Sequence, residues 1–499
     1  MFNKNLLKAI PLASALLAGN AFADEGMWQP HQLKEISGKL KKAGLKLDPS
    51  QMENLDQFPM NAIISLGGCT ASFLSDTGLA ITNHHCAYGS IQYNSTEKKN
   101  LLKQGFVAKD KSQELQAAPG SRIYVTESLT DVTAKITGSI PSSVKGQAYF
   151  KAIEKNQKEL VSACETSQDY RCEVYSFHGG LEYFLIKQLS IRDVRLVYAP
   201  PSSIGKFGGD TDNWMWPRHT GDWAFYRAYV SKDGKPADYS KDNVPFKPKA
   251  FLKVNADGVR NSDYVMVLGY PGRTNRYRTV DEVENQFTWV YPTSKQYRED
   301  YINIIKDIAP AGSDARIKYE STLASLANYA KNFGSMIESY NKGDMLERKQ
   351  AELQALQQWI NSSKQRKNKY AKALTELNAL IAQGKKGQER DLLMGYLGST
   401  NMMSVAKRLY RLANEKTKSD TERKQGYQDR DMNRFTQGMK RVNRRYDATV
   451  DKAVLEHFIG LYAQLPKKER NATFDKYFGI GKNFDAKKLA AKLDMMHKN

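Results

Sequence analysis

One stretch of the sequence, Gly67 to Cys86, carries residue types that favour nucleophilic catalysis. Its apolar and β-branched residues, interrupted by the turn Asp76-Thr77-Gly78, predict a two-stranded hairpin with His85 and Cys86 at the end of the second strand. Histidine suits a general base because its usual pKa of ~6.5 lies close to working pH. A lone histidine is more often a core residue, but the cysteines of this hairpin and a Gly-Asp pair downstream favour a catalytic base at His85.

A histidine base needs a carboxylate that sets its tautomer and stabilises the imidazolium. Asp222 is the candidate, because it follows a glycine in the aromatic segment Trp214 to Arg227, which would exclude water. We predict that His85, and not its neighbour His84, faces Asp222, because adjacent residues at the end of a strand point to opposite sides.

The third member of such a site would be a serine in a Gly-x-Ser-Gly type turn, whose backbone N–H groups form an oxyanion hole. The sequence contains no such turn. Gly-Ser pairs occur, for example at Gly89, Gly138, Gly312, Gly334 and Gly398, but a following glycine is missing. We therefore expect these 499 residues to lack the nucleophile.

The N-terminal segment 1–23 resembles a secretory signal peptide. Lys4 and Lys8 flank the start of a short apolar run, and Ala21-Phe22-Ala23 is a small-x-small cleavage site. We therefore expect export, to the periplasm or the cell surface. Beyond this segment no run of ~20 apolar residues predicts a membrane-spanning helix.

Export to an oxidising compartment predicts that the four cysteines pair. Three pairings are possible, and short spacing favours Cys69 with Cys86 and Cys164 with Cys172. A zinc site is the alternative, but there is no C-x-x-C pair, and adjacent histidines cannot easily face one ion. We expect neither a metal nor another cofactor.

Basic residues outnumber acidic ones by 75 to 54, a net charge of +21. Residues 341–499 contain 34 Lys and Arg and 18 Asp and Glu, so this third carries +16 of the excess. Such an excess can bind nucleic acid or acidic surfaces. No nucleic-acid-binding motif accompanies it, so we favour a solvated helical face and expect neither nucleic acid nor membrane as a partner.

The sequence divides into two kinds of pattern. After a helical lead-in at 29–57, short β-branched and aromatic runs, such as 122–126 and 264–268, alternate with turns up to Tyr277, with one helix at 147–161. This pattern favours a barrel or sandwich. After about Asp281, helical periodicity and Ala, Leu, Lys and Glu dominate. We therefore predict an α+β protein with a β part at 24–280 and a helical part at 281–499.

The sequence resembles the bacterial serine dipeptidyl-peptidases of the dipeptidyl-peptidase 7 and 11 type. The resemblance rests on four motifs: Asp24-Glu25-Gly26-Met27-Trp28, Thr82-Asn83-His84-His85-Cys86, the block from Asp212-Asn213-Trp214 to Asp222, and Leu268-Gly269-Tyr270-Pro271-Gly272-Arg273-Thr274. It implies a chymotrypsin-like double β-barrel with a large helical domain covering the cleft. The implied activity is removal of dipeptides from the free N-terminus of peptides outside the cytoplasm, usually by a homodimer.

The resemblance also implies roles for single residues. His85 matches the catalytic base and Asp222 its orienting carboxylate. Asn213, Trp214 and Asn328 match the positions that hold the substrate's α-ammonium group, where amide oxygens accept its hydrogen bonds and an aromatic face tolerates its charge.

Members of this family continue past the helical domain into a second barrel that carries the serine. We therefore expect the chain to be an incomplete dipeptidyl-peptidase with most of the second barrel missing, inactive on its own. One alternative is a non-catalytic exported protein that binds peptide N-termini, and another is a basic helical protein that binds polyanions.

Overall fold

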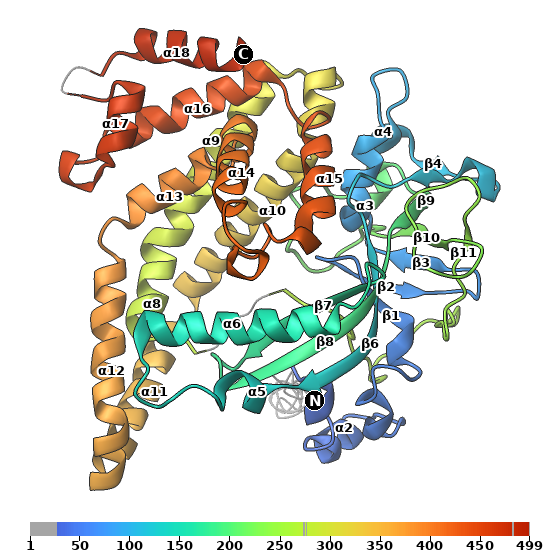
Figure 1. The fold of residues 1–499 in the computed structure, drawn as a ribbon, viewed down its shortest axis with the longest axis horizontal. Helices are drawn as coiled ribbons and strands as arrows, with labels where there is room; N and C mark the ends of the chain where they lie inside the picture. The colour runs from blue at the N-terminus through green and yellow to red at the C-terminus, as the bar shows by residue number, and fades with distance from the viewer. Residues whose placement is uncertain (1–26, 273–274, 276, 482–483, 499) are drawn as a thin grey trace, which may run out of the picture.

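The computed structural model describes residues 27–272, 275, 277–481 and 484–498. The predicted signal peptide, residues 1–23, lies outside these residues, as does part of two of the quoted motifs. The described chain has a strand-rich part, whose last strand ends at Pro245, and a helical part that begins at Val280 (Figure 1). The predicted α+β class is confirmed.

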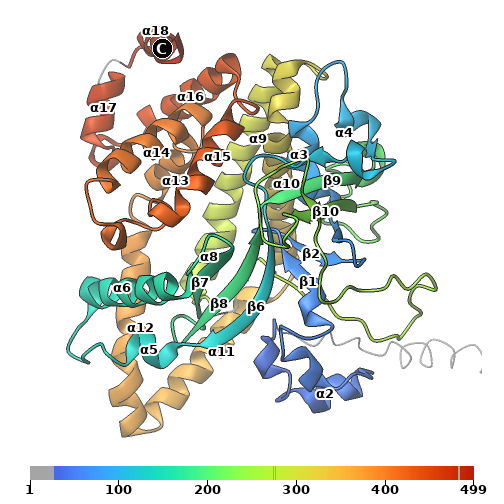
Figure 2. The ribbon, with the colours of Figure 1, turned by 45° about the vertical axis from the view of Figure 1, so that its right-hand side comes forward.

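The strands form one antiparallel sheet in the order β4-β9-β10-β3-β2-β1-β6-β8-β7, with β5 beside β9 and β11 beside β10. Their bounds are β1 Ile63–Ser65, β2 Thr70–Phe73, β3 Leu79–Thr82, β4 Phe106–Val107, β5 Leu115–Gln116, β6 Ile123–Asp131, β7 Tyr170–Phe177, β8 Glu182–Ile191, β9 Asp193–Ala199, β10 Ala224–Val230 and β11 Val244–Pro245. The long strands β6 to β8 extend away from the rest of the sheet (Figure 2).

The helices are α2 Ser37–Lys42, α3 His84–Tyr93, α4 Leu101–Gln104, α5 Thr133–Thr137, α6 Gly146–Cys164, α7 Ser202–Gly205, α8 Val280–Asn285, α9 Tyr291–Ile308, α10 Asp314–Lys342, α11 Met345–Asn361, α12 Lys364–Gly384, α13 Gln388–Leu397, α14 Asn401–Glu415, α15 Met432–Val442, α16 Ala448–Ala463, α17 Ala472–Phe478 and α18 Ala486–Lys498. The predicted helix at 147–161 is confirmed as α6. None of the described helices combines the length and the apolar character needed to cross a bilayer.

The predicted hairpin is confirmed as β2 and β3, which pair from Ala71 with Thr82 to Phe73 with Ala80. Buried and partly exposed residues alternate along both strands, so Phe73 and Ala80 enter the core of the sheet. The chain reverses at Gly78, whose positive φ of 68° suits a residue without a side chain. The hairpin thereby fixes where the chain leaves the sheet after Thr82.

Two strand predictions are wrong. His84 and His85 do not end a strand but begin α3, because Asn83 is extended and the backbone N–H of His85 is hydrogen-bonded by a carboxylate from another segment. Residues 264–268 form no strand although their composition favours one. Val267 is fully exposed, because strand propensity gives a strand only where a neighbouring strand supplies hydrogen-bond partners.

The helical part has its own core, in which α9, α13, α16 and α18 bury aromatic and aliphatic side chains around Phe458 and Tyr462. The long helices α9 and α10 lie side by side between this core and the sheet (Figure 2). Because α10 also contacts α3, it brings residues of the helical part next to His85.

Candidate active site

The His85 imidazole faces Asp222, as predicted. Its Nδ1 lies 2.7 Å from Asp222 Oδ2, and the backbone N–H of His85 donates to Asp222 Oδ1 at 2.9 Å. The pairing of Ala224 on β10 with Thr82 on β3 places the two segments side by side just before the helix begins. An Nδ1–H that donates to Asp222 leaves Nε2 unprotonated and able to accept a proton.

Exposure differs between the two partners. The His85 side chain is 68% exposed, whereas that of Asp222 is 19% exposed. Burial would raise the pKa of Asp222, but the hydrogen bonds it accepts from the His85 side chain and backbone outweigh burial and lower its pKa. The carboxylate therefore stays ionised at neutral pH and orients an imidazole that substrate can reach.

His84 is packed away from this pair. It is 1% exposed, its ring meets the Tyr88 ring edge-on, and burial lowers its pKa. A Cβ on Gly205 would lie 2.5 Å from the ring, so the absence of a side chain there makes room for His84. The side chains of His84 and His85 point in different directions because successive residues of a helix are rotated by about 100°. The strand alternation used in the sequence analysis is not the reason.

Both predicted disulfides are present, Cys69–Cys86 and Cys164–Cys172. The first joins β2 to the first turn of α3 beside His85. The sulfurs of Cys69 and Cys86 lie within 4.8 Å of a His85 ring nitrogen. Because both sulfurs belong to the disulfide, they offer no thiolate to zinc, which removes two of the ligands on which that alternative rests.

The three residues matched to ammonium binding also come together. Asn213 Nδ2 donates to Asn328 Oδ1 at 2.9 Å, and Trp214 Nε1 donates to the same oxygen at 3.1 Å. Asn213 and Trp214 belong to the segment that leads to Asp222, whereas Asn328 lies on α10. Asn213 Oδ1 accepts a hydrogen bond from the Arg218 guanidinium at 2.9 Å.

A cavity of about 620 Å³ opens beside His85, between the sheet, α3 and the helices α14 and α15. His85, Tyr124 and Tyr226 contribute to its wall, together with five arginines: Arg122, Arg408, Arg434, Arg441 and Arg445. The sequence analysis assigned the basic excess to a solvated face and missed them. The available signal was the spacing of Arg434, Gly438, Arg441 and Arg445 along one helical face.

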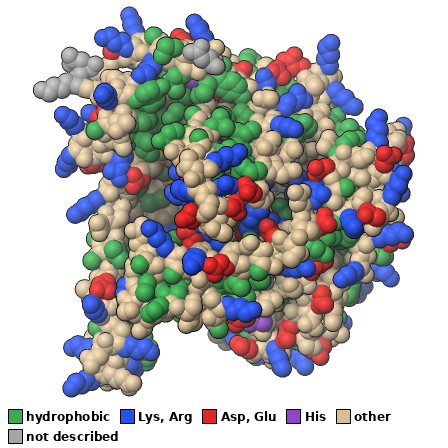
Figure 3. Space-filling model, viewed as in Figure 1, with side chains coloured by type: hydrophobic (Ala, Val, Ile, Leu, Met, Phe, Trp, Pro, Cys, Tyr) green, Lys and Arg blue, Asp and Glu red, His purple; other side chains and the backbone are tan. Residues whose placement is uncertain are grey.

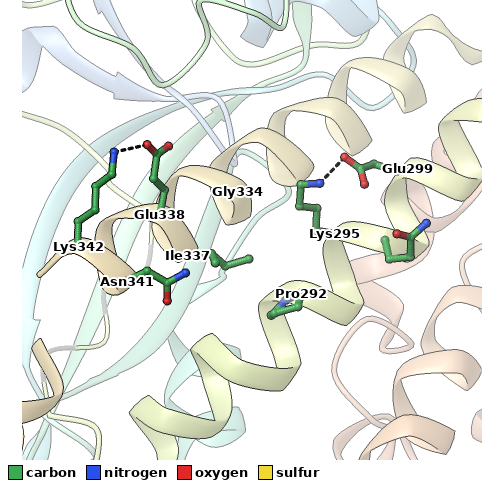
Figure 4. A pocket seen from close by; sticks show the side chains of 9 residues that line it. Pro292, Lys295, Glu299, Gly334, Ile337, Glu338, Asn341 and Lys342 are labelled. Atoms are coloured by element: carbon green, nitrogen blue, oxygen red, sulfur yellow. Dashed lines mark hydrogen bonds and ion pairs between the residues drawn. The ribbon is translucent and has the colours of Figure 1, made fainter.

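A second hollow, between α9 and α10, offers no comparable chemistry (Figure 4). Its acidic and basic side chains are paired within their own helices, Lys295 with Glu299 and Lys342 with Glu338. Among the described residues, no hydroxyl is hydrogen-bonded to a His85 ring nitrogen. The His85–Asp222 pair is therefore the candidate catalytic group, and its nucleophile is not assigned.

Comparison with known proteins places this arrangement among peptidases. The family model described as Peptidase S46 matches residues 23–497. The chain is 42% identical over 489 residues to the Asp/Glu-specific dipeptidyl-peptidase of Shewanella putrefaciens, covering 98% of the chain and 66% of that protein. It is 38% identical over 400 residues to dipeptidyl-peptidase 7 of Porphyromonas gingivalis, covering 79% of the chain and 56% of that protein.

A solved structure is also similar. The crystal structure of Porphyromonas endodontalis DPP11 in complex with the dipeptide Arg-Glu aligns with a TM-score of 0.72 and 27% identity, over 95% of this chain and 74% of that one. The chain thus spans about two thirds or less of the length of the two relatives named above.

Proposed function

The chain belongs to the peptidase S46 family, and from that premise we propose that it supplies the base and the substrate-binding residues of a dipeptidyl-peptidase, which releases dipeptides from the free N-terminus of peptides. The hydroxyl nucleophile that this activity needs is not among the residues assigned above. One observation carries the proposal: the 2.7 Å contact between His85 Nδ1 and Asp222 Oδ2, next to the Asn213–Trp214–Asn328 cluster. The general base then lies at the start of α3, and the site for a positive group is formed by the segment that leads to Asp222 and by α10, which contacts α3.

We propose a serine-type mechanism. His85 Nε2 takes the proton of a hydroxyl nucleophile as its oxygen attacks the scissile carbonyl carbon. Asp222 holds the imidazole and stabilises the imidazolium without taking the proton. The C–N bond then breaks, and the imidazolium gives its proton to the leaving amine. Water, activated by the same base, hydrolyses the resulting ester and returns the hydroxyl.

The Asn213–Trp214–Asn328 cluster explains why cleavage would stop after two residues. Amide oxygens of Asn213 and Asn328 accept hydrogen bonds from the substrate's α-ammonium group, and the indole of Trp214 offers its face to the charge. A fixed distance from this cluster to His85 would select the second peptide bond. An acylated N-terminus carries no positive charge and loses these contacts.

We also propose that the protein works outside the cytoplasm. Two disulfides support this placement, because disulfides persist in oxidising compartments. The homodimer implied by the resemblance stays a prediction.

The test uses a form of the protein that carries a serine nucleophile, and it compares a peptide with a free N-terminus with its N-acetylated copy. We expect dipeptide release only from the free peptide, and labelling by a fluorophosphonate only in a protein that has His85. The matched control is His457→Ala, which removes a histidine whose Nε2 lies 3.3 Å from Asp300 in the helical part. Cleavage that persists in His85→Ala would overturn the proposal. Binding of the free peptide without cleavage would support the non-catalytic alternative.

A further inference from the structure

The cavity beside His85 holds an unusual set of charges. Five arginines line it, and no acidic residue does within the described chain. Arg434 and Arg441 come from α15, Arg445 from the turn after it, and Arg408 from α14, while Arg122 precedes β6 on the opposite wall. Two separate parts of the fold therefore direct guanidinium groups into one space. Figure 3 shows basic side chains in the hollow between these parts.

These guanidinium groups have few partners. Within the described residues none of the five forms an ion pair with a carboxylate. Arg441 donates to the backbone oxygen of Pro119, and Arg122 donates to Asn433 Oδ1 and to the backbone oxygen of Ser121. Arg445 reaches Ser321 Oγ at only 3.4 Å, and its buried Nε has no partner.

The backbone is shaped around these side chains. A Cβ on Gly89 would lie 3.2 Å from Arg445, one on Gly120 3.1 Å from Arg441, and one on Gly438 3.1 Å from Arg408. Three glycines from α3, from the loop before β6 and from α15 thus leave room for three guanidinium groups. Arg408 also lies over the Phe435 ring at 4.9 Å. Packing therefore holds most of these side chains in place, unlike arginines that extend into solvent.

Placing these charges together costs free energy. Burial first, and then repulsion from neighbouring arginines, lowers the pKa of both Arg441 and Arg445. Burial likewise lowers the pKa of Arg122, although Tyr124 and Asp238 act in the opposite direction. A buried cation without a counter-ion is unfavourable. A negatively charged group that enters the cavity from outside would compensate these charges.

We infer that the cavity binds the carboxylates of the part of the peptide that leaves after cleavage, an inference that rests on the proposed function. His85 lines the cavity, whereas Asn213, Trp214 and Asn328 do not. A peptide held by its N-terminus at those three residues and cleaved at His85 continues from His85 into the cavity. Guanidinium groups bind carboxylates through paired hydrogen bonds. About 620 Å³ suits one or two peptide residues.

Such carboxylates come from acidic side chains just after the cleaved bond or from the C-terminus of a short substrate. Calorimetric titration distinguishes them with three peptides: Ala-Ala-Asp-Asp amide, Ala-Ala-Asn-Asn with a free C-terminus, and neutral Ala-Ala-Asn-Asn amide. The titrations use a His85→Ala background, which keeps the peptides intact. We expect one or both carboxylate peptides to bind at least about tenfold more tightly than the neutral one, as charge-assisted hydrogen bonds predict.

Arg434→Gln and Arg445→Gln should each reduce this preference several-fold. The matched control is Arg411→Gln on α14, an exposed arginine outside the cavity, which should leave the preference unchanged. Circular dichroism establishes that each variant is folded. Equal affinity for all three peptides, or a preference that both cavity variants keep, would overturn the inference.

N-acetylated copies of the same peptides separate this inference from the proposed function. If acetylation weakens binding of every peptide but the preference for carboxylates persists, both proposals stand. If acetylation changes nothing while the arginine variants still remove the preference, the arginine site stands and the α-ammonium site does not.

Discussion

The charged groups on the two sides of His85 differ in whether the fold gives them partners. On one side, the Asp222 carboxylate is matched by the His85 ring, the His85 backbone N–H and the side-chain amide of Asn83. On the other side, the arginines have no carboxylate among the described residues. The fold thus provides partners for the Asp222 carboxylate, whereas the proposed ligand would provide the carboxylate that the arginines lack among the described residues.

The basic residues described within 341–499 also fall into two groups, those paired with acidic residues and those without such a partner. On the helical hairpin of α11 and α12, several basic side chains pair with acidic residues one turn away, such as Arg348 with Asp344 and Lys372 with Glu376. These pairs are exposed and contribute little to stability. On α15, Arg434 and Arg441 instead line the cavity beside His85, Arg441 being partly buried and Arg434 exposed. Net charge alone does not distinguish the two arrangements.

The largest effect is expected for the activity when Asp222, the residue with hydrogen-bond partners, is changed. Asp222→Asn keeps the shape of the side chain but favours the wrong imidazole tautomer, so kcat for dipeptide release should fall about 10⁴-fold. Asp300→Asn is the matched control, because Asp300 contacts a histidine in the helical part. Steady-state kinetics on a dipeptidyl substrate, with a form of the protein that carries a serine nucleophile, measures the change; the same form serves for the kcat comparison of the disulfide variants. A loss below about tenfold would mean that Asp222 does not orient the base.

The next effect concerns the disulfide beside the pair. Replacing Cys69 and Cys86 with alanine should lower the free energy of unfolding by about 3 kcal/mol, because it releases a loop of 17 residues. Replacing Cys164 and Cys172, with a separation of 8 residues, should cost about 2.5 kcal/mol. Urea denaturation measures both. Only the replacement of Cys69 and Cys86 should also lower kcat. An equal loss of kcat in both variants would show that the Cys69–Cys86 disulfide has no special role in holding His85.

Removing an arginine from the cavity should raise the free energy of unfolding, whereas removing a disulfide lowers it. Arg445→Met removes a charge that its neighbours repel and keeps apolar bulk, so the unfolding free energy should rise by about 1 kcal/mol. Arg411→Met, on the exposed surface, serves as the control and should change it little. Urea denaturation without ligand provides the measurement. A clear destabilisation by Arg445→Met would indicate that its charge is already compensated in the fold.

The smallest effect is on the pH dependence of stability. Burial lowers the pKa of His84 in the folded state, so below ~6.5 the unfolded chain binds more protons and stability falls. Because the pKa of Asp222 is also lowered, its contribution is lost only as the pH falls from about 3.9 towards its folded value. Thermal unfolding from pH 8 to 5 should show the first loss, and His84→Gln should flatten it. An unchanged slope in that variant would assign the loss to another group.

Several local features were predictable because nearby residues determine them. The hairpin followed from alternating residues around Asp76-Thr77-Gly78, and α6 from its helical periodicity. The disulfides followed from short spacing. The resemblance brought Asn213, Trp214 and Asn328 together before the structure placed them in hydrogen-bond contact.

Other features depended on partners that are distant in sequence. Residues 264–268 have strand composition, but no strand of the described chain pairs with them. His84 begins a helix because a carboxylate 138 residues further along accepts the N–H of the next residue. The arginine spacing on α15 marks a helical face, but its direction depends on how α15 packs beside α3.

The sequence by itself determined the chemistry available: a histidine base, a carboxylate after a glycine, paired cysteines and a basic helical part. Only the tertiary structure decided which charges would meet a partner. Residue type sets the charge of a side chain and local spacing sets its element. Compensation of that charge depends on what the fold brings within a few ångströms, where Coulomb interactions and hydrogen bonds act.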